Sequence, residues 1–520
     1  MRYKASLNYH SGDPEFPAWK QQGHESHLSL HQPLQMKKTL LLFSIVCTST
    51  YMNAQAPLTW LDPVIVNSTL GFDWPRVAVS NSTPIIVWGD FSSGVLLYRR
   101  LVSGTFEPEV QLTPGSLTAN VFALTGPDMK ASGDTVYVTY VDVIEGHAYM
   151  QRSFNQGLTF SDTVRIDNIG DNYAQYPSVD IMPGGDPIVA FAKLNSGFSN
   201  PQYVVTKSSD GGSSFSADVS ATDSLGADPC DCCPGSIVYH DGVVAVIYRN
   251  AINDLRDMRA AISHDGGNTF NEVASIDNHN WIIANCPSTG GQGVIEGDTL
   301  ISVFMNGVNG NQCFLSAFNL NDFQLSFEKP LFNLPGGGTQ NHPRIAASGD
   351  TMAVVWEQII DGHRNIMFTY SLTGASGLGI VVDTISNVLP NGYHTDPDIA
   401  YSHGTFYIVF GDEVAEKIYL MEGILYETSG IQTPSSDDLS IQVAGNLQGD
   451  AITISSNQIL NESFMVSVHN ANGGLCERHN LLRLETSQSL KLDQGLASGI
   501  YLLSIAAKDI SVSFKWVIAR

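Results

Sequence analysis

Residues 208–215 read Ser-Ser-Asp-Gly-Gly-Ser-Ser-Phe, and residues 263–270 repeat the pattern as Ser-His-Asp-Gly-Gly-Asn-Thr-Phe. Both fit S-x-D-x-G-x-[ST]-F, which is typical of a tight turn between two strands. The Asp carboxylate can accept hydrogen bonds from turn amides, glycine tolerates a positive φ, and the aromatic ring can pack into a sheet. Residues 153–160 carry a copy with Asn155 in the Asp position, and Asp322, ahead of Ser326-Phe327, marks a degenerate copy. The repeats predict a fold of many similar β-hairpins.

Two further landmarks extend the repeat over most of the chain. A proline opens a short strand at intervals of 50 to 57 residues, and an aromatic residue ends an apolar strand 13 to 17 residues later. The prolines are Pro75, Pro127, Pro177, Pro234, Pro287, Pro343 and Pro397, and the aromatics are Trp88, Tyr140, Phe191, Tyr248, Phe304, Trp356 and Phe410. Two landmarks that keep the same register seven times indicate a structural repeat. We expect the aromatics to form the core.

Each repeat contains about four short β-rich stretches separated by Gly, Asn and Asp, which is the content of one propeller blade. The sequence therefore predicts an all-β chain: a seven-bladed, alternatively six-bladed, β-propeller at 57–427, followed by a small β-sandwich. The last repeat lacks an outer strand, and residues 62–66 can supply it from ahead of the first repeat. Such an exchange would close the ring.

The turn repeats resemble the Asp-box, or BNR, repeats of sialidase-like propellers. The resemblance implies that Asn155, Asp210, Asp265 and Asp322 are structural and lie on the face opposite the active site. It also implies that the loops before each proline and after each aromatic line the functional face. A ligand pocket is expected there, because binding sites favour preformed concave surfaces.

A sialidase-like activity implies arginines that hold a sugar carboxylate, an acid/base carboxyl group, and a tyrosine nucleophile that a glutamate activates. The candidates at the predicted functional face are Arg249, Arg256 and, less directly, Arg344 for the anion, Glu357 as activator, Asp90 or Asp257 for acid/base work, and Tyr393 as nucleophile. The Arg-Ile-Pro opening of sialidases is replaced by Pro75-Arg76-Val77. Arg76 and Arg344 alternate with Asp128 and Asp398 in neighbouring repeats, which favours a ring of inter-blade ion pairs.

Four cysteines cluster before two neighbouring prolines: Cys230, Cys232, Cys233 and Cys286. In an exported protein, disulfides are the default, with Cys233 bonded to Cys286 or Cys230 bonded to a neighbour. The alternatives are free thiols or a thiolate metal site, which His279 or His342 would join. The cofactor is thus unknown, with a metal ion at the cysteine cluster as one hypothesis.

The N-terminal region predicts export. Residues 36–54 combine a basic start, a short apolar run and a small-residue exit, which is typical of a signal peptide; residues 1–35 form a leader upstream of Met36. The formal net charge of −25 argues against nucleic acid and anionic membranes as partners. No apolar run is long enough for a transmembrane helix. We expect a secreted or cell-surface location.

The C-terminal region follows a polar linker at 428–438 and alternates in short strands over 439–520. Its ending, with Gly499-Ile500-Tyr501-Leu502 and the basic strand around Lys515, resembles the type A C-terminal sorting domain of the type IX secretion system. The resemblance implies the secretion machinery as a partner. A carbohydrate-binding sandwich is the alternative.

Three functions remain open at this point. The first is a glycoside hydrolase of sialidase type that acts on terminal acidic sugars. The second is a propeller without catalytic activity that binds a glycan or a surface protein. The third is a metal- or redox-dependent enzyme that uses the cysteine cluster.

Overall fold

The computed structural model describes residues 58–68, 71–121, 125–333, 339–390 and 392–425 of the propeller region. In the tail it describes residues 441–445, 451–456, 463–470, 475–483, 485–492, 496, 499–506 and 511–518. The predicted leader, signal peptide and linker lie outside these residues. The described elements are strands and four short 3-10 helices: η1 (Asp223–Leu225), η2 (Ile252–Asp254), η3 (Ala375–Gly377) and η4 (Ile385–Val388).

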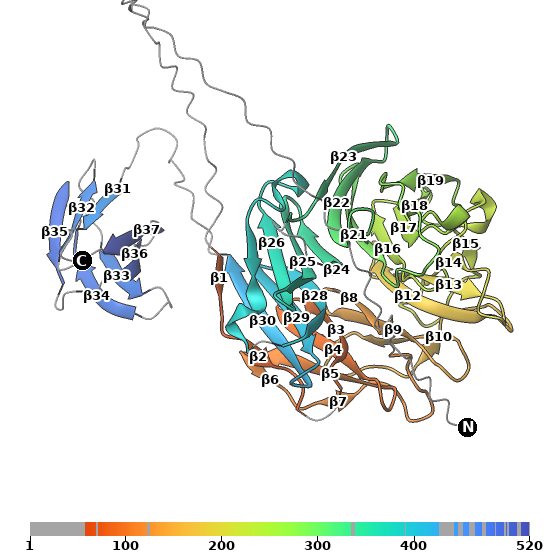
Figure 1. Cartoon of the computed structure of the whole chain (residues 1–520). Coiled ribbons are helices and arrows are strands. Elements are labelled where there is room, and N and C mark those ends of the chain that lie inside the picture. The colour runs from red at the N-terminus through yellow and green to blue at the C-terminus, as the bar shows by residue number, and fades with distance from the viewer. Residues whose placement is uncertain are drawn as a thin grey trace, which may run out of the picture. The chain divides into compact units, whose positions relative to one another are not determined.

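The described residues of the propeller region form seven antiparallel sheets (Figure 1). The first sheet contains β3 (Asp73–Ser80), β4 (Thr83–Asp90), β5 (Val95–Val102), β6 (Thr105–Phe106) and β7 (Val110–Gln111). The second contains β8 (Asp128–Ser132), β9 (Thr135–Val141), β10 (Ala148–Ser153) and β11 (Val164–Arg165). The third contains β12 (Tyr173–Ile181), β13 (Pro187–Leu194), β14 (Gln202–Lys207) and β15 (Val219–Ser220). The fourth sheet contains β16 (Ser236–His240), β17 (Val243–Arg249), β18 (Met258–Ser263) and β19 (Glu272–Ser275). The fifth contains β20 (Gly291–Glu296), β21 (Thr299–Asn306), β22 (Gln312–Asn319) and β23 (Gln324–Pro330). The sixth contains β24 (Gln340–Ser348), β25 (Thr351–Ile360), β26 (His363–Ser371) and β27 (Val382–Thr384).

The last sheet joins the two ends of the propeller region. It contains β28 (His394–Ser402), β29 (Thr405–Asp412) and β30 (Lys417–Leu425), and β30 pairs with β1 (Leu58–Trp60) and β2 (Val64–Ile65) from the start of the described chain. Residues 62–66 therefore contribute to the last sheet, as the sequence predicted. This pairing fastens the ring without a covalent bond.

The first strands of the sheets contact one another in a closed order: β3, β8, β12, β16, β20, β24, β28 and again β3. This is the arrangement of a β-propeller, in which the innermost strands surround a central channel. The seven repeated aromatics that were predicted to form the core are completely buried: Trp88, Tyr140, Phe191, Tyr248, Phe304, Trp356 and Phe410. They lie on the second strand of each sheet, between neighbouring sheets.

The repeated turns connect the third and fourth strands of their sheets. In the β18–β19 turn, Asp265 Oδ1 accepts hydrogen bonds from the Ser263 hydroxyl (2.7 Å) and the Thr269 amide (2.9 Å), and Gly267 adopts a φ of 78°. Asp210 makes the equivalent bonds in the β14–β15 turn, and hydrogen bonds from Ser214 and Ser208 lower its pKa to about 2. Asn155 accepts from the Thr159 amide at 3.0 Å. Asp322, in the degenerate copy, accepts only from the Gln324 amide at 3.1 Å.

The described tail is a separate pair of sheets. One contains β31 (Ile441–Gly445), β32 (Ala451–Ser456) and β35 (Ser487–Lys491); the other contains β33 (Phe464–Asn470), β34 (Leu475–Leu481), β36 (Gly499–Ala506) and β37 (Ser511–Ile518). Ile452 and Ile454 from the first sheet share one buried cluster with Val466 and Leu503 from the second. Two sheets that share one core form the predicted sandwich.

Candidate functional site

Four innermost strands begin with an unusual backbone conformation. Trp74, Tyr176, His342 and Asp396 each stand directly before a proline and have φ values of 49°, 53°, 47° and 53°. The strand pairing shifts register at each of these positions, as at a β-bulge. A positive φ is unfavourable for bulky L-residues and is kept only where the surrounding structure enforces it. The strain recurs at equivalent positions of four sheets, all of them on the face that the sequence predicts to be functional.

These four side chains line one cavity at the mouth of the central channel. The cavity has a volume of about 80 Å³, which is room for roughly five to eight water-sized spheres. In antiparallel sheets the start of the first strand and the turn between the third and fourth strands lie at opposite ends, so the mouth lies opposite the Asp265 and Asp210 turns. The cavity is thus on the predicted ligand face.

Arg76 and Arg344 also line this cavity, and neither makes a direct ion pair with Asp128 or Asp398 among the described residues, so the predicted ring is present only as longer-range attraction between these charges. Asp398 Oδ2 instead accepts the Val77 amide at 2.9 Å, and Asp128 Oδ2 accepts the Val179 amide at 3.0 Å. These bonds join the innermost strands of neighbouring sheets. The carboxylates therefore accept backbone amides of the scaffold, and they also act on the two arginines through space.

The two guanidiniums differ in burial. Arg76 is 5% exposed, and its guanidinium lies over the Trp74 ring. Its Nη1 donates a hydrogen bond to the Pro75 carbonyl oxygen at 2.9 Å, and its Nε is buried without a hydrogen-bond partner. Burial, and then the nearby charge of Arg344, lower its pKa to about 10, so it stays protonated at neutral pH. Arg344 is half-buried and makes no hydrogen bond or ion pair with the described residues. Together they bring two guanidiniums to the channel mouth, where Asp128, Asp396 and Asp398 offset part of their charge.

A histidine and two carboxyl groups lie beside the arginines. His342 Nδ1 is 2.9 Å from Glu357 Oε1 and 3.8 Å from Asp396 Oδ1, and Glu357 Oε1 also accepts the Asp396 amide at 2.7 Å. Arg364 Nε is 3.8 Å from Glu357 Oε2. Burial opposes ionisation of Glu357, but His342 and Arg364 outweigh it and lower the pKa of Glu357. Burial also opposes protonation of His342, yet Glu357 raises the pKa of His342. The two form an ion pair.

Asp396 has the opposite electrostatic character. Burial and the neighbouring Glu357 charge raise its pKa from 3.8 to about 6. Two neighbouring carboxyl groups therefore differ in protonation, which is the usual basis for separate acid and base roles. The three groups have oxygen and nitrogen ligand atoms within 4.8 Å of one another, a set that a divalent cation can also use.

The raised pKa of Asp396 predicts a distinct pH dependence of stability. The folded state holds the Asp396 proton between about pH 4 and 6, where the unfolded chain has lost it, so stability falls as pH rises through this window. The contribution is roughly 2–3 kcal/mol. We expect Asp396→Asn to remove this loss, measured as the free energy of unfolding at several pH values. The lowered pKa of Glu357 acts below this window and the raised pKa of His342 above it. An unchanged slope between pH 4 and 6 in the variant would contradict the assignment.

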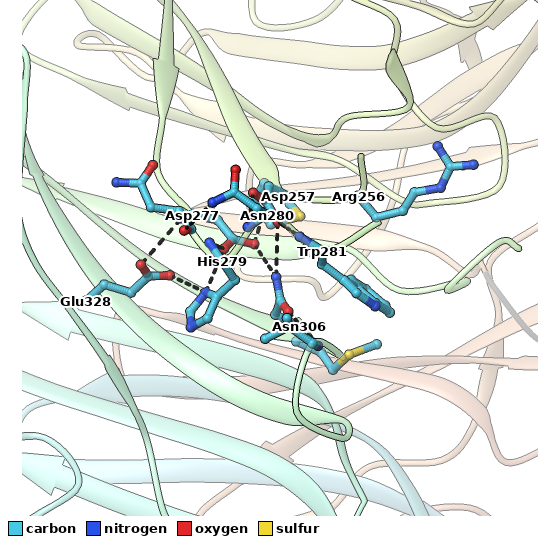
Figure 2. Close-up of polar contacts among 12 residues, drawn as sticks. Arg256, Asp257, Asp277, His279, Asn280, Trp281, Asn306 and Glu328 are labelled. Atoms are coloured by element: carbon cyan, nitrogen blue, oxygen red, sulfur yellow. Dashed lines mark hydrogen bonds and ion pairs between the residues drawn. The ribbon is translucent and has the colours of Figure 1, made fainter. Parts of the chain in front are cut away.

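A second polar cluster lies between the fourth and fifth sheets (Figure 2). His279 Nδ1 is 2.8 Å from both Asp277 Oδ1 and Glu328 Oε1, and Asn306 Nδ2 donates to Asp277 Oδ2 at 2.9 Å. Burial, then the Asp277 charge, raise the pKa of Glu328 to about 7. Asp277, His279 and Glu328 form another group that can hold a cation. Asp277 and Glu328 could not be predicted as site residues from the sequence, because neither belongs to a repeat landmark.

Asp257 belongs to this second cluster and not to the lining of the channel mouth. Its carboxylate accepts the Asn280 amide at 2.8 Å and the Trp281 amide at 2.9 Å, and burial followed by the Asp277 charge raises its pKa. Asp90, the other acid/base candidate, accepts hydrogen bonds from Ser92 and Ser93 in its own turn. Burial opposes these bonds, but they outweigh it and lower the pKa of Asp90. Neither carboxyl group lies among the residues that line the mouth.

Arg249 occupies a structural position. It is 1% exposed, and its guanidinium donates to the carbonyls of Thr289 (2.9 Å), Arg256 (2.6 Å) and Met305 (2.8 Å). The predicted anion-binding role of Arg249 therefore conflicts with its geometry, because its donors are already used by the backbone. Arg256 is less committed: its bonds to Asn285 O and Asp254 Oδ1 are 3.4 and 3.5 Å long. Its guanidinium extends away from the carboxylates of the second cluster (Figure 2).

The structure places all four clustered cysteines together. A disulfide joins Cys232 to Cys286, so the predicted Cys233–Cys286 bond is wrong: Cys233 lies deeper, and its sulfur is 2.7 Å from that of Cys230. The four sulfurs lie within 4.8 Å of one another, and neither His279 nor His342 belongs to this group. Each histidine is instead paired with carboxylates of its own cluster. The expectation of a disulfide is met for one of the two pairs.

Of the sequence candidates, Arg344 lines the channel mouth, and Glu357 contacts it through His342 and Asp396. Tyr393 is 43% exposed and lies under the Arg364 guanidinium, which in turn contacts Glu357. Sequence reasoning assigned His342 and Asp396 to the ligand face without giving them catalytic roles. Their position directly before a repeat proline was the available signal.

Comparison with known proteins identifies the tail. Residues 433–519 match the family described as the secretion system C-terminal sorting domain. The match supports export by type IX secretion to the cell surface or the medium. No helix in the described part of the chain combines the length and hydrophobicity that a bilayer span requires. No curated protein sequence matches the chain.

Among solved structures, the chain is similar to a protein of unknown function from Dyadobacter fermentans, with 12% identity, a TM-score of 0.41, and coverage of 60% of this chain and 98% of that one. It is also similar to a Hadza microbial sialidase, with 12% identity, a TM-score of 0.39, and coverage of 68% and 65%. A mutant Trypanosoma rangeli sialidase with trans-sialidase activity has 9% identity, a TM-score of 0.41, and coverage of 90% and 91%. At these identities the similarity concerns only the fold.

Proposed function

Starting from an exported β-propeller, we propose that the protein binds the acidic group of a terminal glycan sugar at its channel mouth. The observation that carries this proposal is the pair Arg76 and Arg344, which line the cavity without ion pairs to any described residue. Guanidiniums hold carboxylates through charge-assisted, often bidentate, hydrogen bonds. The two guanidiniums have no direct ion pair with a described residue and so remain available to an incoming carboxylate, although Asp128 and Asp396 lie on the same wall.

The size and lining of the cavity indicate that only the carboxylate of the ligand enters it. A volume of about 80 Å³ suits a carboxylate with a few waters and leaves the sugar ring at the rim. Trp74 and Tyr176 line the cavity but are 7% and 8% exposed, so they shape its walls more than they offer an open aromatic face. Ser178 and Ser236 add hydroxyl groups to the wall.

The proposal is tested by titrating the full chain with 3′-sialyllactose and with lactose in a calorimeter. We expect measurable binding of the acidic trisaccharide and none of the neutral disaccharide, because the arginines contribute only when an anion is present. Equal binding of both sugars, or binding of neither, would refute the proposal.

Hydrolysis of the bound glycoside is a second function that a separate observation favours. Asp396 keeps a proton to about pH 6, while the neighbouring Glu357 is ionised and paired with His342. A protonated carboxyl group can donate to a leaving glycosidic oxygen, and the ionised partner can serve as the anionic group of the same site. Asp396 lines the mouth and is thus placed to contact the ligand.

We expect turnover of a fluorogenic sialoside that falls about 10²–10⁴-fold in Asp396→Asn, because general acid catalysis contributes this range. Binding of 3′-sialyllactose should persist in that variant. Asp90→Asn is the matched control, since Asp90 contacts only its own turn, and its activity should equal that of the wild type. Turnover that survives in Asp396→Asn would exclude Asp396 as the acid, and a wild type that binds without turnover would leave binding as the function.

A further inference from the structure

The second polar cluster has no residue in the lining of the channel mouth, and two segments of the chain build it (Figure 2). Asp277 and His279 belong to the connection between β19 and β20, which leads from the fourth sheet to the fifth. Glu328 lies on β23, the outer strand of the fifth sheet. One ligand atom from each of these side chains lies within 4.8 Å of the other two. The three side chains thus converge from segments that are distant in sequence.

The imidazole of His279 has too few protons for its neighbours. Its Nδ1 is 2.8 Å from Asp277 Oδ1 and also 2.8 Å from Glu328 Oε1, and this nitrogen carries at most one proton. The contact with Asp277 has the geometry of a hydrogen bond, whereas Glu328 Oε1 is buried without a hydrogen-bond partner among the described residues. A buried acceptor of this kind is unfavourable. A cation between the three atoms would satisfy both oxygens and the lone pair of a neutral imidazole.

Hydrogen bonds from the scaffold hold the two carboxylates in this arrangement. Asp277 Oδ2 accepts the Met258 amide at 3.1 Å and Asn306 Nδ2 at 2.9 Å. Glu328 Oε2 accepts the Asn278 amide at 3.4 Å. Each carboxylate therefore has one oxygen bonded to the scaffold and the other oxygen turned toward the imidazole nitrogen. Bonds of this kind orient the ligands of metal sites.

The cluster is accessible from one side. The Asp277 side chain is completely buried, whereas the side chains of His279 and Glu328 are 20% and 14% exposed. The His279 ring packs against Phe314, with ring centroids 4.1 Å apart, which fixes the direction of Nδ1. An ion can thus enter from solvent and keep water molecules on its exposed side.

The charges around the cluster favour a cation. Asp257 brings a further carboxylate, because Asn306 Nδ2 lies 3.3 Å from Asp257 Oδ1 and 2.9 Å from Asp277 Oδ2. Arg249 offsets part of this negative charge through space, but its guanidinium donates to backbone carbonyls. The Arg256 guanidinium extends away from the carboxylates (Figure 2). No arginine or lysine of the described chain forms an ion pair with Asp257 or Asp277.

We propose that His279, Asp277 and Glu328 bind one divalent first-row transition-metal ion, such as Mn²⁺ or Zn²⁺, which ties β23 to the connection between the fourth and fifth sheets. Adjacent ligands of an octahedral ion with bonds of about 2.0–2.2 Å lie roughly 2.8–3.1 Å apart, which matches the separation of Nδ1 from both oxygens. One imidazole with two carboxylates suits such an ion better than Ca²⁺, which takes about six to eight oxygens at longer distances. The site is independent of the proposed glycan binding.

The experiment treats the full chain with a chelator, removes the chelator by dialysis, and titrates the chain with Mn²⁺ while electron paramagnetic resonance measures the free ion. Mn²⁺ prefers oxygen and nitrogen ligands to thiolates, so the cysteine cluster does not compete. We expect saturable binding of a single Mn²⁺ at this site and a higher melting temperature in its presence. Glu328→Gln should weaken binding by more than about 100-fold, beyond the loss typical of an outer-shell partner, and should abolish the shift in melting temperature.

Glu272→Gln is the matched control. Glu272 also pairs with a histidine, His264 at 3.2 Å, but this exposed pair has no third ligand, so Mn²⁺ affinity should equal that of the wild type. Circular dichroism checks that each variant folds. Absence of saturable binding in the wild type, or undiminished binding in folded Glu328→Gln, would overturn the proposal.

A spectroscopic signature separates this cluster from the one at the channel mouth, which also contains a histidine and two carboxyl groups. Electron spin echo modulation of the bound Mn²⁺ should contain the nitrogen of a coordinating imidazole. The nitrogen signal should disappear in His279→Gln and persist in His342→Gln. Loss of the signal in His342→Gln and its persistence in His279→Gln would place the ion at the channel mouth and refute the assignment.

Discussion

We expect replacement of Arg344 with alanine to lower the affinity for 3′-sialyllactose by about 10–100-fold and to leave the free energy of unfolding within about 0.5 kcal/mol of the wild type. A hydrogen bond to a charged group contributes about 1.5–3 kcal/mol, and 1.4 kcal/mol corresponds to tenfold in affinity. Stability is preserved because Arg344 is half-buried and makes no contact of this kind with any described residue, so nothing is left unsatisfied by its removal. Calorimetric titration and chemical denaturation measure the two effects.

The same substitution at Arg76 should lower affinity similarly but also destabilise the fold, because Arg76 is 5% exposed and packs on Trp74. Arg344→Lys keeps the charge but not the planar pair of donors, so its affinity should lie between those of the wild type and Arg344→Ala. Arg100→Ala is the matched control, since Arg100 pairs with Glu107 on an outer strand. Undiminished binding in Arg344→Ala would place the acid group elsewhere.

Replacing Arg249 with methionine lowers the free energy of unfolding by about 3–5 kcal/mol. The substitution leaves the carbonyls of Thr289, Arg256 and Met305 without their donor in a buried site, and each unsatisfied buried group costs about 1–3 kcal/mol. Methionine keeps much of the apolar volume, so the loss reports the hydrogen bonds more than a cavity. Denaturation by guanidinium chloride, followed by tryptophan fluorescence, is the measurement.

Arg256→Met provides the comparison within the same segment. Its hydrogen bonds are 3.4 and 3.5 Å long and its Nη1 is buried without a partner, so little hydrogen bonding is lost and the expected loss is below about 1 kcal/mol. Both arginines were predicted from the sequence to hold an anion, and the pair of variants separates that role from a structural one. If Arg249→Met kept its stability but lost ligand binding, the structural role would be contradicted.

The features that the sequence predicted correctly depend on short-range periodicity. The repeat of proline and aromatic residues predicts where strands begin and which side chains are buried, because an extended strand alternates its faces strictly and each blade repeats the same alternation. Trp88 and Trp356 are completely buried for this reason. The Asp265 and Asp210 turns were equally predictable, since their hydrogen bonds join residues at most four positions apart.

The features that were predicted wrongly from the sequence depend on the direction in which a side chain points and on contacts between blades. The alternation of Arg76 and Arg344 with Asp128 and Asp398 gave the right signs of charge, but the carboxylates turn to the backbone amides of the next strand. Arg249 follows an aromatic landmark and was therefore placed on the ligand face, although carbonyls from the neighbouring sheet enclose its guanidinium. A side chain's orientation is settled by its neighbours across blades, which are 40 or more residues away in sequence.

By itself, the sequence determined that this protein is a repetitive all-β propeller with turns of one type, an exported chain, and a sorting domain at its C-terminus. Only the tertiary structure decided which residues meet at the channel mouth and how the cysteines pair. Strand alternation and turn chemistry are local, so a few neighbouring residues are enough to encode them. The meeting of Arg76 with Arg344, or of Cys232 with Cys286, requires the ring to close, because only then do distant blades bring their first strands into contact.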